Sequence, residues 1–152
     1  MPINRVGHVV LKVRDVEKAK KFYLDFLRMK VSMENPGKAI FMRFNDYHHD
    51  LAVFQVGPDA DLPKDNQVGL VHVALVCNSD EEVRGYLDRA KAMGIDVRST
   101  SDHDITHSLY LKDPEGNIIE IYAETDYDWP NLWRGPVAKP FDLEAVKPAP
   151  VV

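Results

Sequence analysis

Apolar and polar residues follow one another in a pattern that predicts the order strand, helix and three strands, used twice. Residues 5–13 read as a strand, and apolar side chains from Val16 to Phe26 then recur at helical spacing behind the N-cap residue Asp15. This helix is expected to end near Met29. Three shorter strands are then predicted, at 31–33, 39–44 and 49–56.

The same order begins again after residues 57–69, which are rich in Gly, Pro and Asp and have no periodicity, as expected of a linker or exposed loop. A strand is predicted at 70–77. Ser79 and Glu82 form a capping box that starts a helix, and Gly94 ends it. The last predicted strands are at 96–99, 106–112 and 117–123.

The two halves superpose with a shift of 64 residues. GHVVLKV at 7–13 then falls on VHVALVC at 71–77, and His8 falls on His72 (72 − 8 = 64). We expect an α+β fold of two tandem βαβββ modules, at about 4–56 and 69–124, within a domain of residues 1–125. Their mixed sheets would pair edge to edge and enclose a cup, with the helices outside.

Strand parity predicts which side chains enter this cup. In the first strand of each module alternate residues face the helices, which leaves His8 and His72 on the cup side. In the last strand Ile119 and Ile121 face the helices, so Glu120 also faces the cup. A carboxylate in the middle of a strand is costly to bury unless it is paired or binds a metal ion.

Two imidazoles and one carboxylate that converge on one cavity form a 2-His-1-carboxylate triad, a ligand set that suits Fe(II) with open coordination positions. A divalent ion with one carboxylate ligand keeps a net positive charge, so it can bind an anionic chelating substrate and also O2. The alternative is two hydrogen-bonded strand histidines and a glutamate at the rim. The equivalent positions of His8 and His72 in the repeat favour the metal site.

With these residues in place, the chain resembles the vicinal oxygen chelate superfamily, and within it the single-domain type I extradiol ring-cleavage dioxygenases. The resemblance covers about residues 4–125 and is carried by GHVVLKVRDVEKAKKFY, HHDLAVF at 48–54, VHVALV and SLYLKDPEGNIIEIY. It implies an Fe(II)-dependent enzyme, with Mn(II) as the other metal to consider, that uses O2 to cleave the ring of a catecholic substrate.

The resemblance also implies roles for individual residues. His8, His72 and Glu120 match the iron ligands of the family. His49 matches its acid-base histidine, and Tyr110 matches the tyrosine that hydrogen-bonds the substrate oxygen. The alternatives are a solvated strand-end residue for His49 and an ordinary strand aromatic for Tyr110.

The family usually has one more active-site histidine in the loop before the tyrosine strand. His103 is the nearest candidate for this catalytic role, although Ser101 lies closer to the expected place and His107 competes with it. Val53 falls near the place that mirrors Glu120, where glyoxalase I relatives commonly supply a fourth ligand. Since valine cannot ligate a metal, this position favours a bidentate substrate plus O2.

Two other functions stay open. One is a metal-dependent enzyme of the glyoxalase or epimerase type that uses Mn, Ni, Co or Zn and deprotonates a substrate carbon. The other is a metal-free binder of small molecules, similar to the bleomycin resistance proteins. Stoichiometric metal in the purified protein would exclude the binder.

Composition excludes several partners. The 152 residues are 45% hydrophobic and carry a net charge of −5 without a long basic cluster, so neither nucleic acid nor an anionic membrane surface is expected as a partner. The absence of a signal peptide and of a long apolar stretch predicts a cytoplasmic protein. Cys77 is the single cysteine and is expected to be a buried, inert thiol. A homo-oligomer is expected by analogy with similar folds.

Residues 126–152 form a Pro-rich C-terminal extension that holds five of the ten prolines. We expect it to be extended, with little regular structure. Its large aromatic residues are Trp129, Trp133 and Phe141. They are expected to pack across the domain, close the mouth of the cup or dock on a second subunit.

Overall fold

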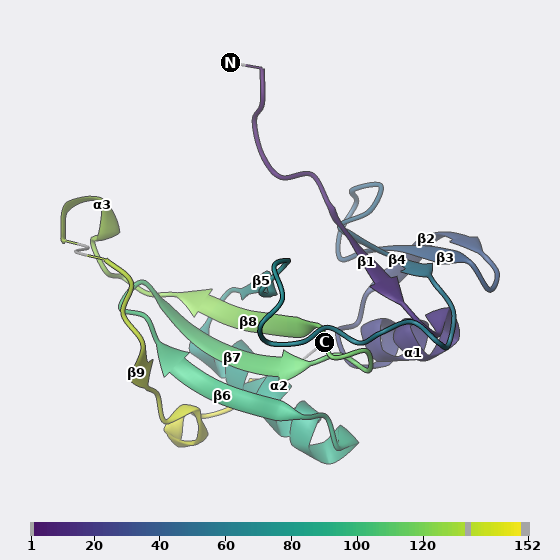
Figure 1. Ribbon diagram of the computed structural model, residues 1–152. Coiled ribbons are helices and arrows are strands. Elements are labelled where there is room, and N and C mark those ends of the chain that lie inside the picture. Colours follow the sequence, from purple (N-terminus) through teal and green to yellow (C-terminus); the bar gives the residue numbers. More distant parts are fainter. Residues whose placement is uncertain (1, 133–134, 150–152) are drawn as a thin grey trace. The chain divides into compact units, whose positions relative to one another are not determined.

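The computed structural model describes residues 2–132 and 135–149, and it divides the chain into two compact units that meet between Asp65 and Asn66. Each unit contains one β-sheet with a helix packed against one of its faces (Figure 1). Among the described residues, no helix is long and apolar enough to span a membrane.

The first unit contains one four-stranded sheet in the order β1-β4-β3-β2, in which β1 and β4 are parallel. Its elements are β1 (Val9–Val13), α1 (Val16–Asp25), β2 (Lys30–Asn35), β3 (Ala39–Arg43) and β4 (Leu51–Gln55). Asp15 caps α1, because its Oδ1 accepts hydrogen bonds from the backbone N–H groups of Glu17 and Lys18. Four apolar side chains of α1 are buried against the sheet: Val16, Ala19, Phe22 and Tyr23.

The second unit repeats this topology, with a five-stranded sheet in the order β5-β8-β7-β6-β9. Its elements are β5 (Val73–Cys77), α2 (Asp80–Met93), β6 (Val97–Asp102), β7 (Thr106–Lys112), β8 (Ile118–Glu124), α3 (Trp129–Leu132), β9 (Lys139–Pro140) and the 3-10 helix η1 (Leu143–Ala145). Gly94 ends α2 in the left-handed conformation, with φ of 66°, as the sequence predicts. The α+β class and the two βαβββ modules are thus confirmed.

The predicted capping box of α2 does not form. Ser79 is the N-cap residue, but its side chain makes no capping hydrogen bond. The carboxylate of Glu82 instead accepts from the backbone N–H of Asn78, at 2.8 Å, and also contacts the Asn78 amide. In a capping box the Glu82 carboxylate would accept a hydrogen bond from the backbone N–H of Ser79. Here the backbone and side-chain amides of Asn78 contact that carboxylate instead.

Three predicted strands begin later than expected. β1 begins at Val9, β5 at Val73 and β4 at Leu51, so His8 and His72 each lie one residue before a strand and His49 lies in the loop before β4. A strand begins where its residues acquire a ladder partner, and alternation alone does not indicate that point. His8 and His72 keep their equivalent positions in the repeat.

The register of the parallel strand pairs corrects one prediction. Val10 pairs with Ala52 in the first unit, and Ala74 pairs with Glu120 in the second. Ala52, not Val53, therefore occupies the position equivalent to Glu120. Val53 pairs with Leu11 and is fully buried. The difference is one residue, which moves a strand side chain to the other face of the sheet. Alanine, like valine, offers no ligating atom.

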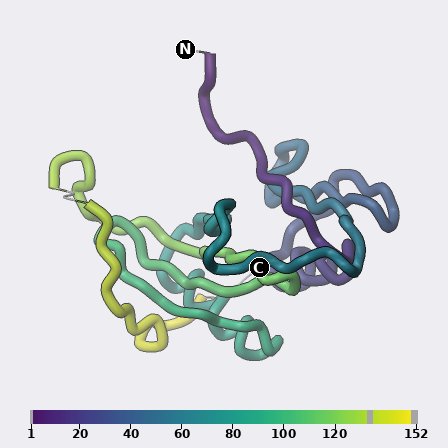
Figure 2. The backbone as a smooth tube through the Cα atoms, viewed as in Figure 1, coloured from purple at the N-terminus to yellow at the C-terminus, as the bar shows by residue number. Residues whose placement is uncertain are grey.

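Residues 135–149, the C-terminal segment, have more regular structure than expected. β9 pairs with the end of β6, and the Thr100 hydroxyl donates to the carbonyl of Phe141 at 2.6 Å. On α2, Arg84 donates to three carbonyls of this segment, including that of Val146, and Leu143 is 1% exposed. Figure 2 shows the segment passing the end of β6, where β9 pairs with its last two residues. Trp133 lies outside the described residues.

Candidate active site

Glu120 lies in the middle of β8, between neighbours on two strands. Its ladder partners are Ala74 on β5 and Tyr110 on β7. The adjacent residues Ile119 and Ile121 are buried on the α2 side of the sheet, so Glu120 is on the other face, as parity predicts. It is nevertheless only 7% exposed. A buried carboxylate needs partners, and the structure supplies them from β7 and from the residue before β5.

Both carboxylate oxygens of Glu120 have a partner. Oε2 lies 3.0 Å from Nε2 of His72, and Oε1 accepts a hydrogen bond from the Tyr110 hydroxyl at 2.8 Å. In the described part of the chain, no Lys or Arg forms an ion pair with this carboxylate. An imidazole nitrogen and a carboxylate oxygen in this arrangement, without a permanent cation, suit a divalent metal ion.

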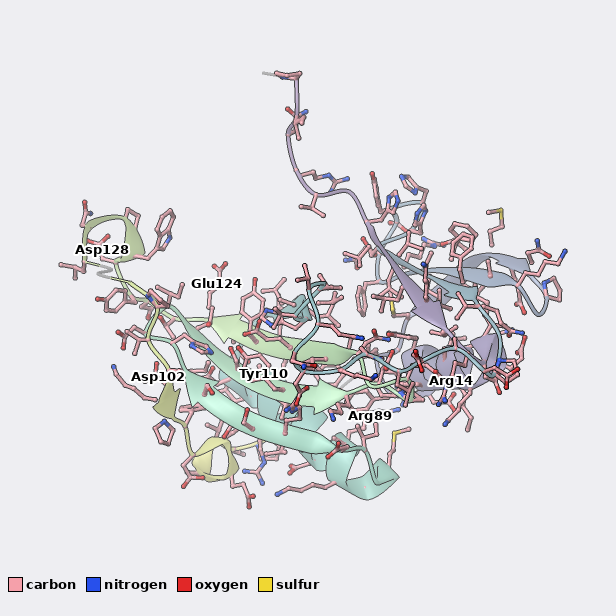
Figure 3. All side chains as sticks on the ribbon, in the orientation of Figure 1. Arg14, Arg89, Asp102, Tyr110, Glu124 and Asp128 are labelled. Atoms are coloured by element: carbon pink, nitrogen blue, oxygen red, sulfur yellow. The ribbon has the colours of Figure 1, made fainter. Side chains whose placement is uncertain are left out.

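Tyr110 links the carboxylate to a second histidine. Burial and the hydrogen bond to Glu120 raise the pKa of Tyr110 to about 12, so the phenol keeps its proton near neutral pH. Nε2 of His103 lies 2.9 Å from the same hydroxyl. Nδ1 of His103 meets the carbonyl of Val137 in the C-terminal segment. Figure 3 labels Tyr110 on its strand.

The contact with the Val137 carbonyl determines which ring nitrogen of His103 carries the hydrogen. A carbonyl only accepts, so Nδ1 must carry a hydrogen and, in the neutral ring, Nε2 must be an acceptor. The phenol proton of Tyr110 therefore has two acceptors within reach, Nε2 of His103 and Oε1 of Glu120. This shared proton is positioned for transfer to a ligand that contacts Tyr110.

His107 is on the other face of the sheet. Its Nδ1 lies 2.7 Å from the carboxylate of Asp80 at the start of α2, and its ring stacks on Phe141 at 4.0 Å between centroids. Ser101 pairs with Ser108 across the β6–β7 ladder. Of the residues considered for the additional histidine role, His103 is the one that contacts Tyr110.

The first unit contains its own group of histidines. The rings of His8 and His49 lie 4.3 Å apart between centroids, and the Nδ1 atoms of His48 and His49 are 2.6 Å apart. Phe41 packs against His49 edge to face, at 5.1 Å between centroids. Partial burial lowers the pKa of His49, and the neighbouring His8 and His48 act in the same direction. His49 is therefore favoured as a neutral ring that can accept a proton.

Two of the three predicted metal ligands, His72 and Glu120, lie together in the second unit. The third, His8, belongs to the first unit. Within residues 2–132 and 135–149, no group of three or more His, Cys, Asp or Glu side chains is arranged to hold a metal ion.

A cavity of about 450 Å³ opens beside Glu120 in the second unit. Tyr122 and Glu124, which share a strand face with Glu120, line it together with Trp129. The sequence alone predicted no role for Tyr122, Glu124 or the Val137 carbonyl. Strand parity could have indicated Glu124. No sequence pattern indicates a contact made by a backbone carbonyl.

Comparison with known proteins defines the family. The chain matches the model of the Glyoxalase/Bleomycin resistance protein/Dioxygenase superfamily over residues 5–121. This match covers most of both units, and the chain belongs to that superfamily. The relatives of the chain include proteins with different activities.

The curated relatives include a biphenyl-2,3-diol 1,2-dioxygenase 3 from Rhodococcus globerulus, with 31% identity over 79% of this chain. The chain spans 63% of that protein's length. A metallothiol transferase FosB from Lysinibacillus sphaericus is 27% identical, with 84% of this chain and 88% of that protein aligned. The crystal structure of a lactoylglutathione lyase from Agrobacterium tumefaciens, at 22% identity, covers 81% of this chain and 96% of its own with a TM-score of 0.65. The last similarity supports the fold.

Proposed function

We propose that the chain is an Fe(II)-dependent extradiol dioxygenase that cleaves the ring of a catecholic substrate with O2, with Mn(II) as the alternative metal. The observation that carries the proposal is the buried carboxylate of Glu120, which meets His72 on one oxygen and Tyr110 on the other. The 31% identity to a biphenyl-diol dioxygenase supports the same reaction class.

The proposed metal ligands are His72, Glu120 and His8. The first two lie 3.0 Å apart. His8 is included because it holds in the first unit the repeat position that His72 holds in the second. Ala52, at the position equivalent to Glu120, adds no fourth ligand. When bound, the metal ion would supply a Lewis acid with open positions for a diol and for O2.

The remaining residues donate hydrogen bonds to the substrate or transfer protons. Tyr110 keeps its phenol proton near neutral pH and can redirect its hydrogen bond from Oε1 of Glu120 to a substrate oxygen, which leaves the carboxylate free to bind the metal. Nε2 of His103 is the second acceptor within reach of the same hydroxyl. His49, with its lowered pKa, accepts a proton from the diol at a ring nitrogen and returns it later in the reaction. A small aromatic diol is thus the proposed substrate, and a homo-oligomer the proposed assembly.

The test begins with anaerobic purification and metal analysis by mass spectrometry. Iron-loaded protein is then mixed with catechols while O2 uptake and the yellow ring-cleavage product are recorded. We expect His8→Ala to lose both metal and turnover and His49→Ala to keep the metal but lose turnover. His107→Ala is the control, because His107 lies on the opposite sheet face, and it should keep both. Iron-loaded protein that consumes no O2 with any catechol would contradict the proposal.

A second candidate is a metal-dependent transferase or glyoxalase-type enzyme on the same site. It is favoured by the near-complete alignment with a metallothiol transferase, since the two chains match over 84% and 88% of their lengths. Thiol consumption by Mn-loaded protein without O2 uptake would favour this candidate. Protein purified without stoichiometric metal would instead favour a small-molecule binder of the same fold.

A further inference from the structure

The cavity beside Glu120 has an acidic wall. Glu120, Tyr122 and Glu124 project into it from alternate positions of β8, and Trp129 from α3 also lines it. Its volume of about 450 Å³ is within the range of small-molecule sites. All of the residues that line it belong to the second unit.

Glu124 is the charged group on this wall that has no partner of its own. The Glu120 carboxylate contacts His72 and Tyr110, whereas the exposed carboxylate of Glu124 forms no hydrogen bond or ion pair with a described side chain. The described lining contains no Lys, Arg or His. The nearby Lys139 is paired with Asp104. The potential at this end of the cavity is therefore negative, and it opposes a ligand that brings a carboxylate there.

Trp129 adds an aromatic surface to the same cavity. Its side chain is 62% exposed, so a ligand could cover much of an indole that now faces solvent. An indole face attracts both aromatic rings and ammonium groups. In Figure 3, Glu124 is labelled at the end of β8 and projects away from the sheet.

The spacing along β8 fits a substrate of limited length. Glu124 lies four positions after Glu120, which corresponds to roughly 13 Å between their Cα atoms at about 3.3 Å per residue. Both side chains are long and can lean toward each other. The remaining gap suits one aromatic ring whose oxygens lie near Glu120 and whose short side chain ends near Glu124.

We propose that Glu124 and Trp129 form a subsite for a cationic substituent, so that the preferred substrates are catechols with a short side chain ending in an ammonium group. Catechols with a carboxylate at the same place are disfavoured. The inference rests on the proposed function for the identity of the ring that lies near Glu120. The charge preference itself rests on the cavity.

Three probes of similar shape test the charge preference: dopamine, 4-propylcatechol and 3-(3,4-dihydroxyphenyl)propionate. With iron-loaded protein, we expect kcat/KM for the cation to exceed that for the anion by at least about tenfold at low ionic strength, where surface charges are weakly screened. In Glu124→Gln, the cation-to-anion ratio should fall by about tenfold. Asp142→Asn removes one acidic charge outside the cavity lining and should leave the ratio unchanged.

A binding experiment does not depend on turnover. Tyramine, 4-propylphenol and 3-(4-hydroxyphenyl)propionate are titrated into the metal-free protein, and the indole N–H resonance of Trp129 is followed by NMR. Tyramine should bind most tightly and lose this advantage in Glu124→Gln. Equal binding of the cation and the anion to the unmodified protein would overturn the inference.

The two experiments separate the two proposals. Turnover of catechols without charge discrimination would overturn the cationic subsite and leave the dioxygenase proposal standing. Charge-selective binding of tyramine without O2 uptake on any catechol would overturn the dioxygenase proposal and support the subsite formed by Glu124 and Trp129.

Discussion

Cys77, at the end of β5, has a thiol that the fold holds in its neutral form. Burial raises the pKa of Cys77 to about 12, and the charge of Glu82 acts in the same direction. The raised pKa favours the folded state below the ordinary thiol pKa, and this contribution is lost as the pH rises toward 12. Cys77 is partly exposed and not buried as predicted, although its raised pKa agrees with an inert thiol.

Alkylation by iodoacetamide measures this effect, because the thiolate is the reacting form. At pH 8 we expect the folded protein to react roughly 100- to 1,000-fold more slowly than the chain unfolded in guanidinium, as the difference between the two pKa values requires. The folded rate should increase about tenfold per pH unit up to pH 10. Equal rates in the folded and unfolded chains would contradict the raised pKa.

His103 provides a second prediction at this scale. The Val137 carbonyl should hold the neutral ring with its hydrogen on Nδ1. Long-range ¹H–¹⁵N NMR spectra of labelled protein distinguish the two tautomers directly. Tyr110→Phe removes the hydroxyl but not the carbonyl, so the Nδ1–H tautomer should persist in that variant. A neutral ring with its hydrogen on Nε2 would show that the contact with Val137 does not persist in solution.

The residues of the site were only partly predictable from the sequence. Parity placed Glu120 on the face opposite α2, because alternation in a strand is a local property, whereas the role of Tyr110 was implied by the family resemblance. The contact of His103 with Val137 joins residues 34 positions apart and involves a backbone atom, so it has no side-chain signature. The assignment of Val53 was wrong by one residue because register depends on pairing with β1.

At the scale of elements, the C-terminal segment is held mainly by η1. Leu143 is 1% exposed, and Arg84 of α2 donates to the carbonyls of Leu143 and Val146. The Lys91 ammonium adds an exposed ion pair with Glu144 at 2.6 Å. Exposed pairs contribute little, so the buried leucine should supply most of the stabilisation.

Leu143→Ala should therefore lower the free energy of unfolding by about 2–5 kcal/mol, measured by urea denaturation. The matched control is Leu132→Ala in α3, where the side chain is 52% exposed. That change should stay within about 0.5 kcal/mol. Equal losses in the two variants would mean that η1 does not anchor the segment.

Helices and strands were predicted more reliably than their ends. The two helices follow from apolar side chains and end residues that are close together in the sequence. The first residues of β1, β4 and β5 depend on partners from distant strands, so the sequence did not reveal them. The proline content of the tail concealed β9 and η1, because their stability comes from contacts with β6 and α2.

At the scale of the whole molecule, a long connection joins the two units. No helix or strand lies between Gln55 and Val73, and Val68, Leu70 and Val71 are strongly exposed. Such a segment can enter a protease active site without unfolding of either sheet.

Brief trypsin treatment should cut first after Lys64 and give fragments of 64 and 88 residues (152 − 64 = 88), identified by mass spectrometry. Lys112 serves as the internal comparison, because it is paired within the β7–β8 ladder and should be cut later. Lys64→Gln should remove the early products. Early cleavage after Lys112 would show that the β7–β8 ladder opens to the protease as readily as the connection between the two units.

The short strand β9 also affects how the protein behaves at high concentration. It pairs with Ser101 and Asp102, and its second residue, Pro140, has no N–H group to offer to a further strand. Another copy of the chain would thus find the end of the β6 edge already occupied by a strand that cannot continue the hydrogen-bonding pattern. The C-terminal segment in this way protects the Ser101–Asp102 end of the β6 edge against pairing with a strand of another molecule.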